Sequence, residues 1–345
     1  MVGGAEALKA FDYMKEIGEF GLFTVPNTFR WARHPTIVRQ SPPIIRYMND
    51  TLPASPCYLN GTFMPLNEAK ISVMDRGFIF GDGIYEVVPL YGGVPFRFEH
   101  HMARFTRSLQ ELRITNPLSS TQWRAVVDSL VLQFTEYTGI AAAQQDQLIY
   151  LQITRGVAMR DHVMPENITP TVFAMCNRMS APSPQQREQG VACVSAEDFR
   201  WEKAHIKATS LLGAVFARQI SHDAGALETI MFRNGFLSEA AASNVWVVKN
   251  NTVFGVPKDN LVLEGIRFGL IEEICRARHL PFELRRISRA EVLDADELLL
   301  SSATKEVLAI TTLDGAPVGH PSHRGRPGPV LAQLYAGYQD AKRAT

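Results

Sequence analysis

The sequence predicts a mixed α/β protein built from two domains. Segments typical of strands alternate with segments typical of helices along the chain, which favours sheets covered by helices. The 345 residues suffice for roughly two domains, and 46% hydrophobic with 20% charged residues is ordinary for a globular chain. We expect an N-terminal extension over 1–56, a small α/β domain over 57–176, a polar, proline-containing linker over 177–190 and a large α/β domain over 191–345.

The charge balance excludes several classes of partner. The chain has 35 basic and 35 acidic residues, so no net field attracts nucleic acid or an acidic membrane surface. No apolar run approaches the roughly 20 residues that span a bilayer. The four cysteines are scattered without a C-x-x-C pair, which favours a reducing compartment and no structural metal. We expect a cytoplasmic protein with no metal site.

The extension differs in pattern from the remainder of the chain. Apolar residues recur at threes and predict a short amphipathic helix over residues 5–18, whereas residues 29–46 are basic and rich in proline. No continuous apolar core follows a charged start, so a secretory signal is not expected. Because the clear pattern begins after Met48, that methionine is a candidate natural start. We expect removal of residues 1–47 to leave a soluble and active protein.

The small domain begins with a hairpin over 58–63, in which Asn60-Gly61 is a strong turn signal. Apolar residues at helical spacing predict two helices, and Ser119, Ser120 or Thr121 is expected to cap the second. The expected helices cover 100–114 and 121–137, and the expected strands cover 84–91, 148–154 and 171–175.

The large domain shows the same alternation. Gly225 is a good stop for a helix that follows Lys207, and Ser288 and Glu291 have the spacing of a capping box. The expected strands cover 191–195, 227–233, 244–248 and 297–302, and further helices cover 264–279 and a segment from about 329.

The stretch 198–219, DFRWEKAHIKATSLLGAVFARQ, contains the first chemical candidate. Polar and aromatic residues lead into Lys207, and an apolar run at helical spacing follows. This pattern predicts that Lys207 lies where a strand gives way to a helix, with apolar neighbours on both sides. Desolvation lowers the pKa of a lysine in such a place and suits it to Schiff-base chemistry. Taken alone, the pattern also fits a surface lysine whose stem covers an apolar edge.

Four other features complement this lysine. Glu239 stands among small residues, where a carboxylate needs a cationic or proton-bearing partner. Arg104 lies beside an apolar helical stripe, and the helix start at Gly265-Ile266 offers free N–H groups to an anion. The stretch 301–304 supplies hydroxyl donors. A lysine, an acid, an arginine, a helix start and hydroxyls are the parts needed to hold pyridoxal phosphate.

From Tyr58 to its end the chain resembles the class IV aminotransferases, which are pyridoxal-phosphate enzymes of fold type IV with the cofactor between two domains. Within them it is most similar to the D-amino-acid aminotransferases. The segments that carry the resemblance are DRGFIFGDGIYEVV, HHMARF, TRGVAMRDHVMPEN, HIKATSLLGAVFARQ, LSEAAASNVW, LEGI and SSATKEV.

The resemblance implies a role for each candidate. Lys207 would be the Schiff-base lysine and proton shuttle, and Glu239 would bond the pyridine nitrogen. The phosphate would be held by Arg104, backbone groups at Ile266 and Arg267, Ser302 and Thr304. The substrate carboxylate would be bound by Tyr85, Arg160 and His162. In that subclass the arginine and histidine come from the partner subunit, so a homodimer with shared active sites is implied.

Two positions depart from the family pattern. Arg267 stands where relatives commonly have threonine, and Ala303 replaces a hydroxyl residue common in that loop. These departures affect the phosphate contacts and leave the lysine and the acid in place.

The implied reaction is transamination of D-amino acids such as D-alanine, D-glutamate or D-aspartate with 2-oxoglutarate or pyruvate. Three alternatives share the fold and cofactor: 4-amino-4-deoxychorismate lyase, branched-chain L-aminotransferase and (R)-amine transaminase. The Arg160-x-His162 pair favours the D-amino-acid enzyme. A non-enzymatic scaffold is disfavoured because Lys207 and Glu239 are both present.

Overall fold

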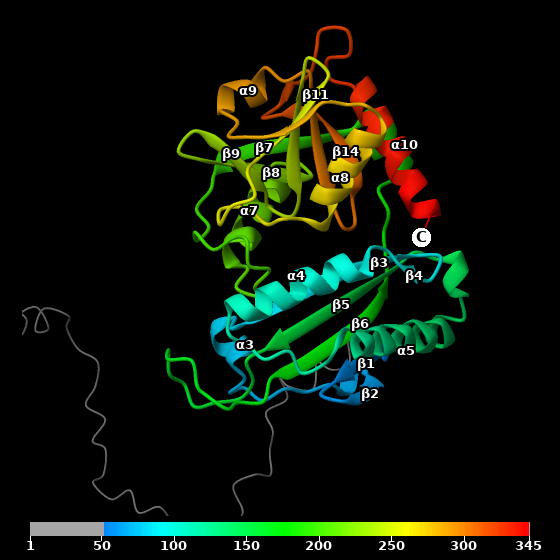
Figure 1. The fold of residues 1–345 in the computed structure, drawn as a ribbon, viewed down its shortest axis with the longest axis vertical. Helices are drawn as coiled ribbons and strands as arrows, with labels where there is room; N and C mark the ends of the chain where they lie inside the picture. Colours follow the sequence, from blue (N-terminus) through cyan, green and yellow to red (C-terminus); the bar gives the residue numbers. More distant parts are fainter. Residues whose placement is uncertain (1–51, 345) are drawn as a thin grey trace, which may run out of the picture. The chain divides into compact units, whose positions relative to one another are not determined.

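A computed structural model describes residues 52–344 of the chain, which form two sheets with their covering helices (Figure 1). The described residues belong to a single compact unit, 49–345. The helix expected over 5–18 and the irregular stretch expected over 29–46 lie outside the described residues.

The first sheet has six strands in the order β2-β1-β6-β5-β3-β4, and every neighbouring pair is antiparallel. At the hairpin between β1 and β2, Asn60 has φ 48° and Gly61 has φ 95°, as the Asn-Gly turn requires. The predicted hairpin is therefore confirmed. The strands are β1 Pro56–Leu59, β2 Thr62–Pro65, β3 Gly83–Tyr91, β4 Val94–Pro95, β5 Gln147–Thr154 and β6 Thr171–Arg178.

Two long helices, α4 Phe98–Glu111 and α5 Ser120–Thr138, lie against this sheet (Figure 1). Ser119 caps α5 through a capping box with Gln122, so the predicted cap is confirmed. The apolar sides of these helices close a core around Trp123 and Phe105, whose rings meet edge to face. Three short helices complete this part of the molecule: η2 Leu66–Glu68, α3 Arg76–Phe80 and η3 Ala142–Gln144.

The second sheet has nine strands in the order β12-β11-β10-β13-β14-β7-β8-β9, with β15 beside β14. It is a mixed sheet, because β14 and β8 run parallel to β7 and β12 runs parallel to β11. The strands are β7 Val191–Glu197, β8 Glu228–Arg233, β9 Phe236–Ala240, β10 Asn244–Lys249, β11 Thr252–Gly255, β12 Phe282–Leu284, β13 Glu297–Ser302, β14 Glu306–Leu313 and β15 Ala316–Pro317.

Helices α7 Leu212–Asp223, α8 Ile266–Ala277, α9 Arg289–Leu293 and α10 Pro329–Arg343 accompany this sheet (Figure 1). The Ser288 capping box that the sequence predicts starts α9. A second core, distinct from the one under α4 and α5, forms around Trp246, Phe268 and Tyr338. Each sheet thus has its own core, which confirms the two-domain α/β architecture.

The chain passes from the first sheet to the second between Arg178 and Val191. This stretch is not wholly irregular, because α6 Pro184–Gln189 forms there with Ser183 as its cap. Strand β6 continues through Arg178, two residues into the stretch expected to be the linker. We retain the boundaries 57–176, 177–190 and 191–345 as a proposal.

The surroundings of Lys207 differ from the sequence prediction. Strand β7 ends at Glu197 and α7 begins at Leu212, so the strand predicted to lead into Lys207 is not there. The intervening segment is irregular but is bonded to both sheets. Asp198 N–H donates to the Phe232 carbonyl of β8, and Ala208 forms an isolated bridge with Ile84 of β3. In α7, Leu212 is 68% exposed and Phe216 is 59% exposed. Leu212 and Val215 line the same cavity as Lys207, so the apolar run borders this cavity without fully burying the lysine.

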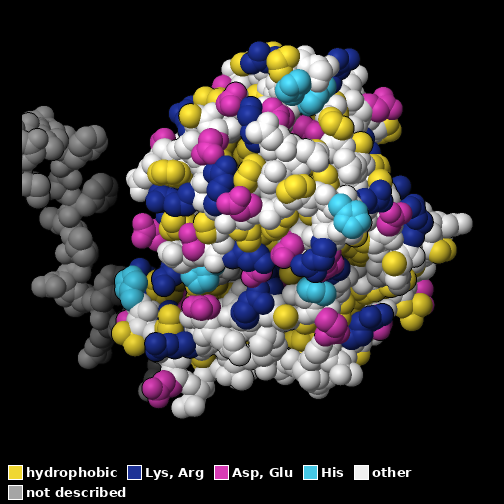
Figure 2. Space-filling model, turned by 45° about the horizontal axis from the view of Figure 1, so that its top comes forward, with side chains coloured by type: hydrophobic (Ala, Val, Ile, Leu, Met, Phe, Trp, Pro, Cys, Tyr) yellow, Lys and Arg dark blue, Asp and Glu magenta, His cyan; other side chains and the backbone are white. Residues whose placement is uncertain are grey.

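The surface has no region dominated by one sign of charge on the face that Figure 2 shows, where acidic and basic side chains are interspersed. Among residues 52–344, no helix combines the length and the apolar character that crossing a membrane demands.

Candidate active site

A cavity of about 1170 Å³ lies between the two sheets and is lined by residues of both. This volume exceeds that of most sites for a single small ligand and has room for a cofactor together with a substrate. Eight of the ten site residues predicted from the sequence line it: Tyr85, Arg104, Lys207, Glu239, Ile266, Arg267, Ser302 and Thr304.

Lys207 is half-buried on the wall of this cavity. Its Nζ lies 4.0 Å from the centre of the Tyr85 ring, close enough for a cation–π contact. The backbone around it is fixed to β3, because Tyr85 N–H donates to the Lys207 carbonyl at 3.0 Å and Thr209 N–H donates to the Gly83 carbonyl at 2.9 Å. The first sheet therefore places the lysine, although the lysine follows the second sheet's strand β7 in sequence.

Glu239 lies within β9 and is only 4% exposed, so its side chain is shielded from water. Its Oε1 accepts hydrogen bonds from Arg200 Nη1 at 2.6 Å and from Leu263 N–H at 3.2 Å. Its Oε2 accepts from Asn244 Nδ2 at 3.2 Å. Burial raises the pKa of Glu239, and the charge and hydrogen bond of Arg200 offset part of that increase.

Arg200 is a site residue that the sequence analysis missed. Its guanidinium joins two carboxylates, because Nε and Nη2 donate to Asp198 while Nη1 donates to Glu239. Burial disfavours its charge, but Asp198 and Glu239 outweigh that effect and raise the pKa of Arg200. The guanidinium thus stays charged and supplies the cationic partner that a buried glutamate requires. A local signal existed, since Asp198 and Arg200 stand two residues apart just before Lys207.

Arg104 lies in α4 and is 5% exposed. Its Nε donates to Glu86 Oε2 at 2.9 Å, its Nη2 donates to Glu86 Oε1, and its Nη1 donates to the Glu264 carbonyl at 3.1 Å. Burial alone would favour neutral Glu86, but Arg104 and His101 outweigh it and lower the pKa of this carboxyl. Burial lowers the pKa of His101 to about 4, so this imidazole is neutral at neutral pH.

Glu86 and His101 were also missed. Glu86 interrupts the apolar strand β3 and is fully buried, and a carboxylate in such a strand requires a partner. Because a buried carboxylate needs a partner, Glu86 in the sequence indicates that a basic side chain is buried next to it. The sequence could not have chosen Arg104 and His101, because the helix that carries them meets β3 only in the folded protein.

The start of α8 faces the cavity with its first N–H groups uncapped by any side chain. Gly265 is the N-cap, and a Cβ there would lie 2.1 Å from Asn244 Oδ1. Only glycine allows this close approach, which places the helix start beside the amide that bonds Glu239. Uncapped N–H groups at a helix N-terminus favour an anion, as predicted for Ile266 and Arg267.

The hydroxyl-bearing loop follows β13 and also lines the cavity. Trp246 Nε1 donates to Ser301 Oγ at 2.9 Å and fixes the base of the loop in the core. Ser302 Oγ accepts from Lys305 N–H at 3.1 Å, which leaves its own hydroxyl proton free to donate. Ser302 and Thr304 are both partly exposed to the cavity.

Arg267, the second residue of α8, is 1% exposed and lies over the rings of Phe96 and Tyr338 at 5.0 Å and 5.5 Å. Its Nη2 donates to the Ala303 carbonyl at 3.2 Å, so the two residues that depart from the family pattern contact each other. Among the described residues it forms no ion pair, and its Nε and Nη1 have no hydrogen-bond partner. A buried cation with no described carboxylate opposite it, beside a helix N-terminus, favours binding of an anion.

Arg160 and His162 are not among the residues that line this cavity. Both are exposed on the loop between β5 and β6, where each contacts the ring of Phe80. Phe80 itself does line the cavity. Tyr85 is therefore the single member of the predicted carboxylate-binding group that one chain brings to its own cavity.

A family model described as amino-transferase class IV matches residues 83–313, which is more than half of the chain. The chain belongs to the class IV aminotransferases. The matched region includes every predicted site residue from Tyr85 to Thr304. The protein is therefore an aminotransferase.

Curated relatives and solved structures agree with that assignment. The aminotransferase is 33% identical over 282 residues to a D-alanine aminotransferase of Bacillus licheniformis, covering 82% of this chain and 95% of the relative. It is 34% identical over 283 residues to a D-alanine aminotransferase of Staphylococcus aureus, covering 82% and 96%.

Two solved structures show the same fold. A branched-chain amino acid aminotransferase of T.th., complexed with N-(5'-phosphopyridoxyl)-L-glutamate, superimposes with a TM-score of 0.74 at 21% identity, covering 85% of this chain and 95% of that one. The branched-chain enzyme of Escherichia coli gives a TM-score of 0.70 at 22% identity, covering 82% and 92%.

The cavity of the aminotransferase fits a phosphorylated, aldehyde-bearing cofactor on its own geometry. One end presents uncapped N–H groups and hydroxyls, with Arg267 in its lining and no carboxylate of residues 52–344 paired with that arginine. The wall presents the Lys207 amine, and a buried carboxylate lies at Glu239. An anion site, an amine and a buried acid within one cavity match the three functional groups of pyridoxal phosphate.

Proposed function

We propose that this aminotransferase uses pyridoxal phosphate to transfer the amino group of D-amino acids, such as D-alanine, to 2-oxo acids such as 2-oxoglutarate or pyruvate. The observation that carries the proposal is the contact of Lys207 Nζ with the Tyr85 ring in the same cavity as buried Glu239. The D-alanine aminotransferases at 33% and 34% identity support the choice of substrate. Four free, buried cysteines support a reducing, cytoplasmic setting.

Different residues of the cavity would bind different groups of the cofactor. The backbone N–H groups of Ile266 and Arg267, the hydroxyls of Ser302 and Thr304, and the charges of Arg104 and Arg267 would hold the phosphate. Glu239 would accept a hydrogen bond from the protonated pyridine nitrogen, and Lys207 would bond the aldehyde carbon. When bound, pyridoxal phosphate supplies an electron-accepting ring conjugated to the substrate nitrogen.

Lys207 is placed to move the proton at the substrate Cα. Its fixed backbone and its contact with Tyr85 restrict Nζ to one side of the cavity. A general base that is held in place removes a proton more effectively than one that must be collected from water. Glu239 must remain an anion to stabilise a protonated ring nitrogen, and the charge of Arg200 at 2.6 Å serves that purpose.

The position at which the substrate carboxylate is bound would determine which enantiomer of the amino acid the enzyme accepts. Arginine can grip a carboxylate with two parallel hydrogen bonds, and an imidazole and a phenol add donors from other directions. With Arg160, His162 and Tyr85 holding the carboxylate on one side, the Cα–H bond of only one enantiomer is directed to Lys207. This is the basis for proposing D-amino acids.

We also propose a homodimer in which the loop of one subunit completes the cavity of the other. Arg160 and His162 are exposed and lie outside their own chain's cavity. Large apolar side chains near them are exposed too, including Met159 at 83% and Val163 at 72%. Exposed apolar clusters of this kind mark protein interfaces.

The first test compares substrates. Purified full-length protein with pyridoxal phosphate is assayed with D-alanine, L-alanine, L-leucine and (R)-1-phenylethylamine, each with 2-oxoglutarate. We expect the highest kcat/KM for D-alanine and no turnover by Lys207→Ala. A preference for L-leucine would place the enzyme with the branched-chain group. Pyruvate elimination from aminodeoxychorismate would reveal the lyase.

The second test examines the shared site by mixing variants. Lys207→Ala and Arg160→Ala are each unfolded, mixed and refolded, or co-expressed. A mixed dimer has one intact site and one doubly defective site, so activity should return to about a quarter of the wild type from two impaired parents. If Arg160 acted within its own chain, mixing would restore nothing.

A further inference from the structure

The loop between β5 and β6 carries two proposed substrate-binding residues but is itself exposed. Residues 159–164 are exposed, yet Arg160 and His162 must hold a carboxylate in one orientation if they have the role proposed above. Exposed loops with few buried contacts open easily, and misplacement of a binding group by about 1 Å can reduce catalysis about 100-fold. Some part of the fold must therefore fix this loop.

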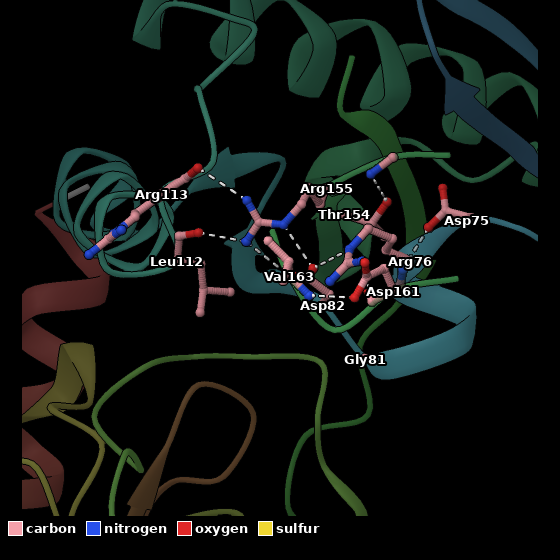
Figure 3. A network of polar contacts seen from close by, with 12 residues as sticks. Asp75, Arg76, Gly81, Asp82, Leu112, Arg113, Thr154, Arg155, Asp161 and Val163 are labelled. Atoms are coloured by element: carbon pink, nitrogen blue, oxygen red, sulfur yellow. Dashed lines mark hydrogen bonds and ion pairs between the residues drawn. The ribbon is translucent and has the colours of Figure 1, made fainter. Parts of the chain in front are cut away.

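Arg76, the first residue of α3, makes the contact that does so (Figure 3). Its Nη1 donates to the carbonyl of Asp161 at 2.5 Å, and Asp161 stands between Arg160 and His162. The backbones also join, because Arg76 N–H donates to the Gly156 carbonyl at 2.8 Å. One residue thus holds both the start and the tip of the loop.

Arg76 is itself held rigidly. Its side chain is 4% exposed, and its Nε donates to Asp82 Oδ2 at 2.8 Å. Arg155 donates to the same carboxylate through Nε at 2.8 Å and Nη2 at 3.0 Å, and its guanidinium also reaches the carbonyls of Leu112 and Arg113 (Figure 3). The cluster of Arg76, Asp82 and Arg155 therefore ties α3, β5 and the end of α4 together.

The charges of this cluster keep Asp82 ionised and so stabilise its ion pairs with Arg76 and Arg155. Burial would favour neutral Asp82, but hydrogen bonds and charges from Arg155 and Arg76 outweigh it and lower the pKa of this carboxyl. Two guanidinium groups on one carboxylate leave an excess positive charge, which a peptide carbonyl such as that of Asp161 partly stabilises.

Phe80 links the same arginine to both binding groups. The Arg76 guanidinium lies 4.7 Å from the centre of the Phe80 ring, and that of Arg160 lies 5.5 Å away. The His162 ring centre is 5.5 Å from the same ring. The phenyl ring therefore restricts the directions of the two side chains, while the hydrogen bond to Asp161 restricts the backbone between them.

We propose that Arg76 is a positioning residue that sets the affinity of this aminotransferase for substrate carboxylates through Arg160 and His162. The proposal rests on the carboxylate-binding role proposed above. The forked guanidinium is essential, because Nε bonds Asp82 while Nη1 reaches the Asp161 carbonyl. Lysine retains the charge but has one nitrogen and cannot span both partners.

The test is a double-mutant cycle on the holoenzyme with Arg76→Lys, Arg160→Ala and the combination. We expect Arg76→Lys to raise the KM for D-alanine about tenfold, with kcat changed by less than about twofold and cofactor affinity unchanged. In the Arg160→Ala background its effect on KM should be much smaller, because only the contribution through His162 remains. Amide hydrogen exchange over residues 157–164 should become faster in Arg76→Lys.

Arg278→Lys is the matched control, because Arg278 forms a surface ion pair with Asp340 at 2.6 Å on the other domain. It should leave KM and loop exchange unchanged. If Arg76→Lys does not fold, Phe80→Leu replaces it and should also raise KM.

The outcomes separate the two proposals. A wild-type KM in Arg76→Lys, or an effect of equal size with and without Arg160, overturns the positioning role. A wild-type KM in Arg160→Ala overturns the carboxylate-binding role as well, whatever Arg76→Lys does.

Discussion

At the scale of single residues, the two arginines at the phosphate end of the cavity differ in their partners. Arg104 is paired with buried Glu86, whereas Arg267 forms no ion pair with any described residue. Removing one member of a buried pair leaves an uncompensated charge, while removing an unpaired charge relieves a desolvation penalty. The same chemical substitution should therefore have opposite effects at the two positions.

We predict that Arg104→Met destabilises the cofactor-free protein by about 3 kcal/mol, because Glu86 then loses its main partner. Arg267→Met should leave the cofactor-free protein as stable as the wild type or stabilise it by about 1 kcal/mol. Both should weaken pyridoxal phosphate binding. Urea unfolding and inorganic phosphate titration of the cofactor-free proteins measure these effects, and a large loss of stability in Arg267→Met would show that its charge is compensated.

Glu239 gives the second prediction at this scale. Glu239→Gln preserves the shape and the contact with Asn244 but removes the negative charge that pairs with Arg200. We expect cofactor binding to persist and kcat for D-alanine to fall by about 100-fold, since the ring nitrogen loses its anionic partner. Steady-state kinetics combined with cofactor absorbance measure both quantities. Undiminished turnover would contradict the role assigned to this carboxylate.

At the scale of elements, α7 is exposed where an amphipathic helix would ordinarily be buried. Its buried residues are Ala217 and Ser221, whereas Leu212 and Val215 border the cavity and Phe216 is exposed away from it. A helix that packs only small residues against its own sheet leaves its large apolar side chains for another surface. We infer that the proposed subunit interface includes this surface of α7.

We predict that the wild-type protein is a dimer and that Phe216→Glu converts it into a monomer and abolishes most of the activity. Phe216 is 59% exposed and does not line the cavity, so the variant leaves the site of its own chain unchanged. Leu132→Glu is the matched control, since Leu132 is 60% exposed on α5. Light scattering after gel filtration measures the mass of both. A dimeric Phe216→Glu protein would exclude α7 from the interface.

At the scale of the whole described unit, Glu306 joins segments that are distant in sequence. It stands at the start of β14 with φ 57° and is 2% exposed. It pairs with Arg187 of α6 at 3.0 Å and with Lys342 of α10 at 2.8 Å. The segment that connects the two sheets is thus fastened to the end of the loop that carries Ser302 and Thr304.

The pH dependence of this contact is predictable. Burial would raise the pKa of Glu306, but Lys342 and Arg187 outweigh burial and lower it. A carboxyl whose pKa is lowered on folding stabilises the protein above its unfolded pKa of about 4.3, and that contribution is lost as pH falls through the folded value. Glu306→Gln should therefore lower the free energy of unfolding by about 1–3 kcal/mol at pH 7.

Urea unfolding of the wild type and Glu306→Gln at pH 7 and near pH 3 measures this contribution. The difference between the two proteins should shrink at the lower pH. A difference that is equal at both values would show that the ionised carboxylate is not its source.

The sequence by itself determined the regular elements of this protein. The Asn60-Gly61 turn, the Ser119 and Ser288 caps and the apolar spacing of α4 and α5 act over a few residues, so their signals are local. It also determined which residue types form the site, because a lysine, an acid and an anion-binding helix start stand in recognisable segments. Of the ten site residues selected from the sequence, all except Arg160 and His162 line the cavity.

Only the tertiary structure decided the pairings. Arg200 with Glu239, Arg104 with Glu86 and Arg76 with the Asp161 carbonyl join elements that are far apart in the chain, and no local pattern encodes such contacts. The same reason explains the missing strand before Lys207, whose backbone is fixed by β3 rather than by its own neighbours. The spacing of apolar residues predicts that α7 has an apolar side. Whether that side packs against the same chain or against another chain depends on the tertiary and quaternary structure.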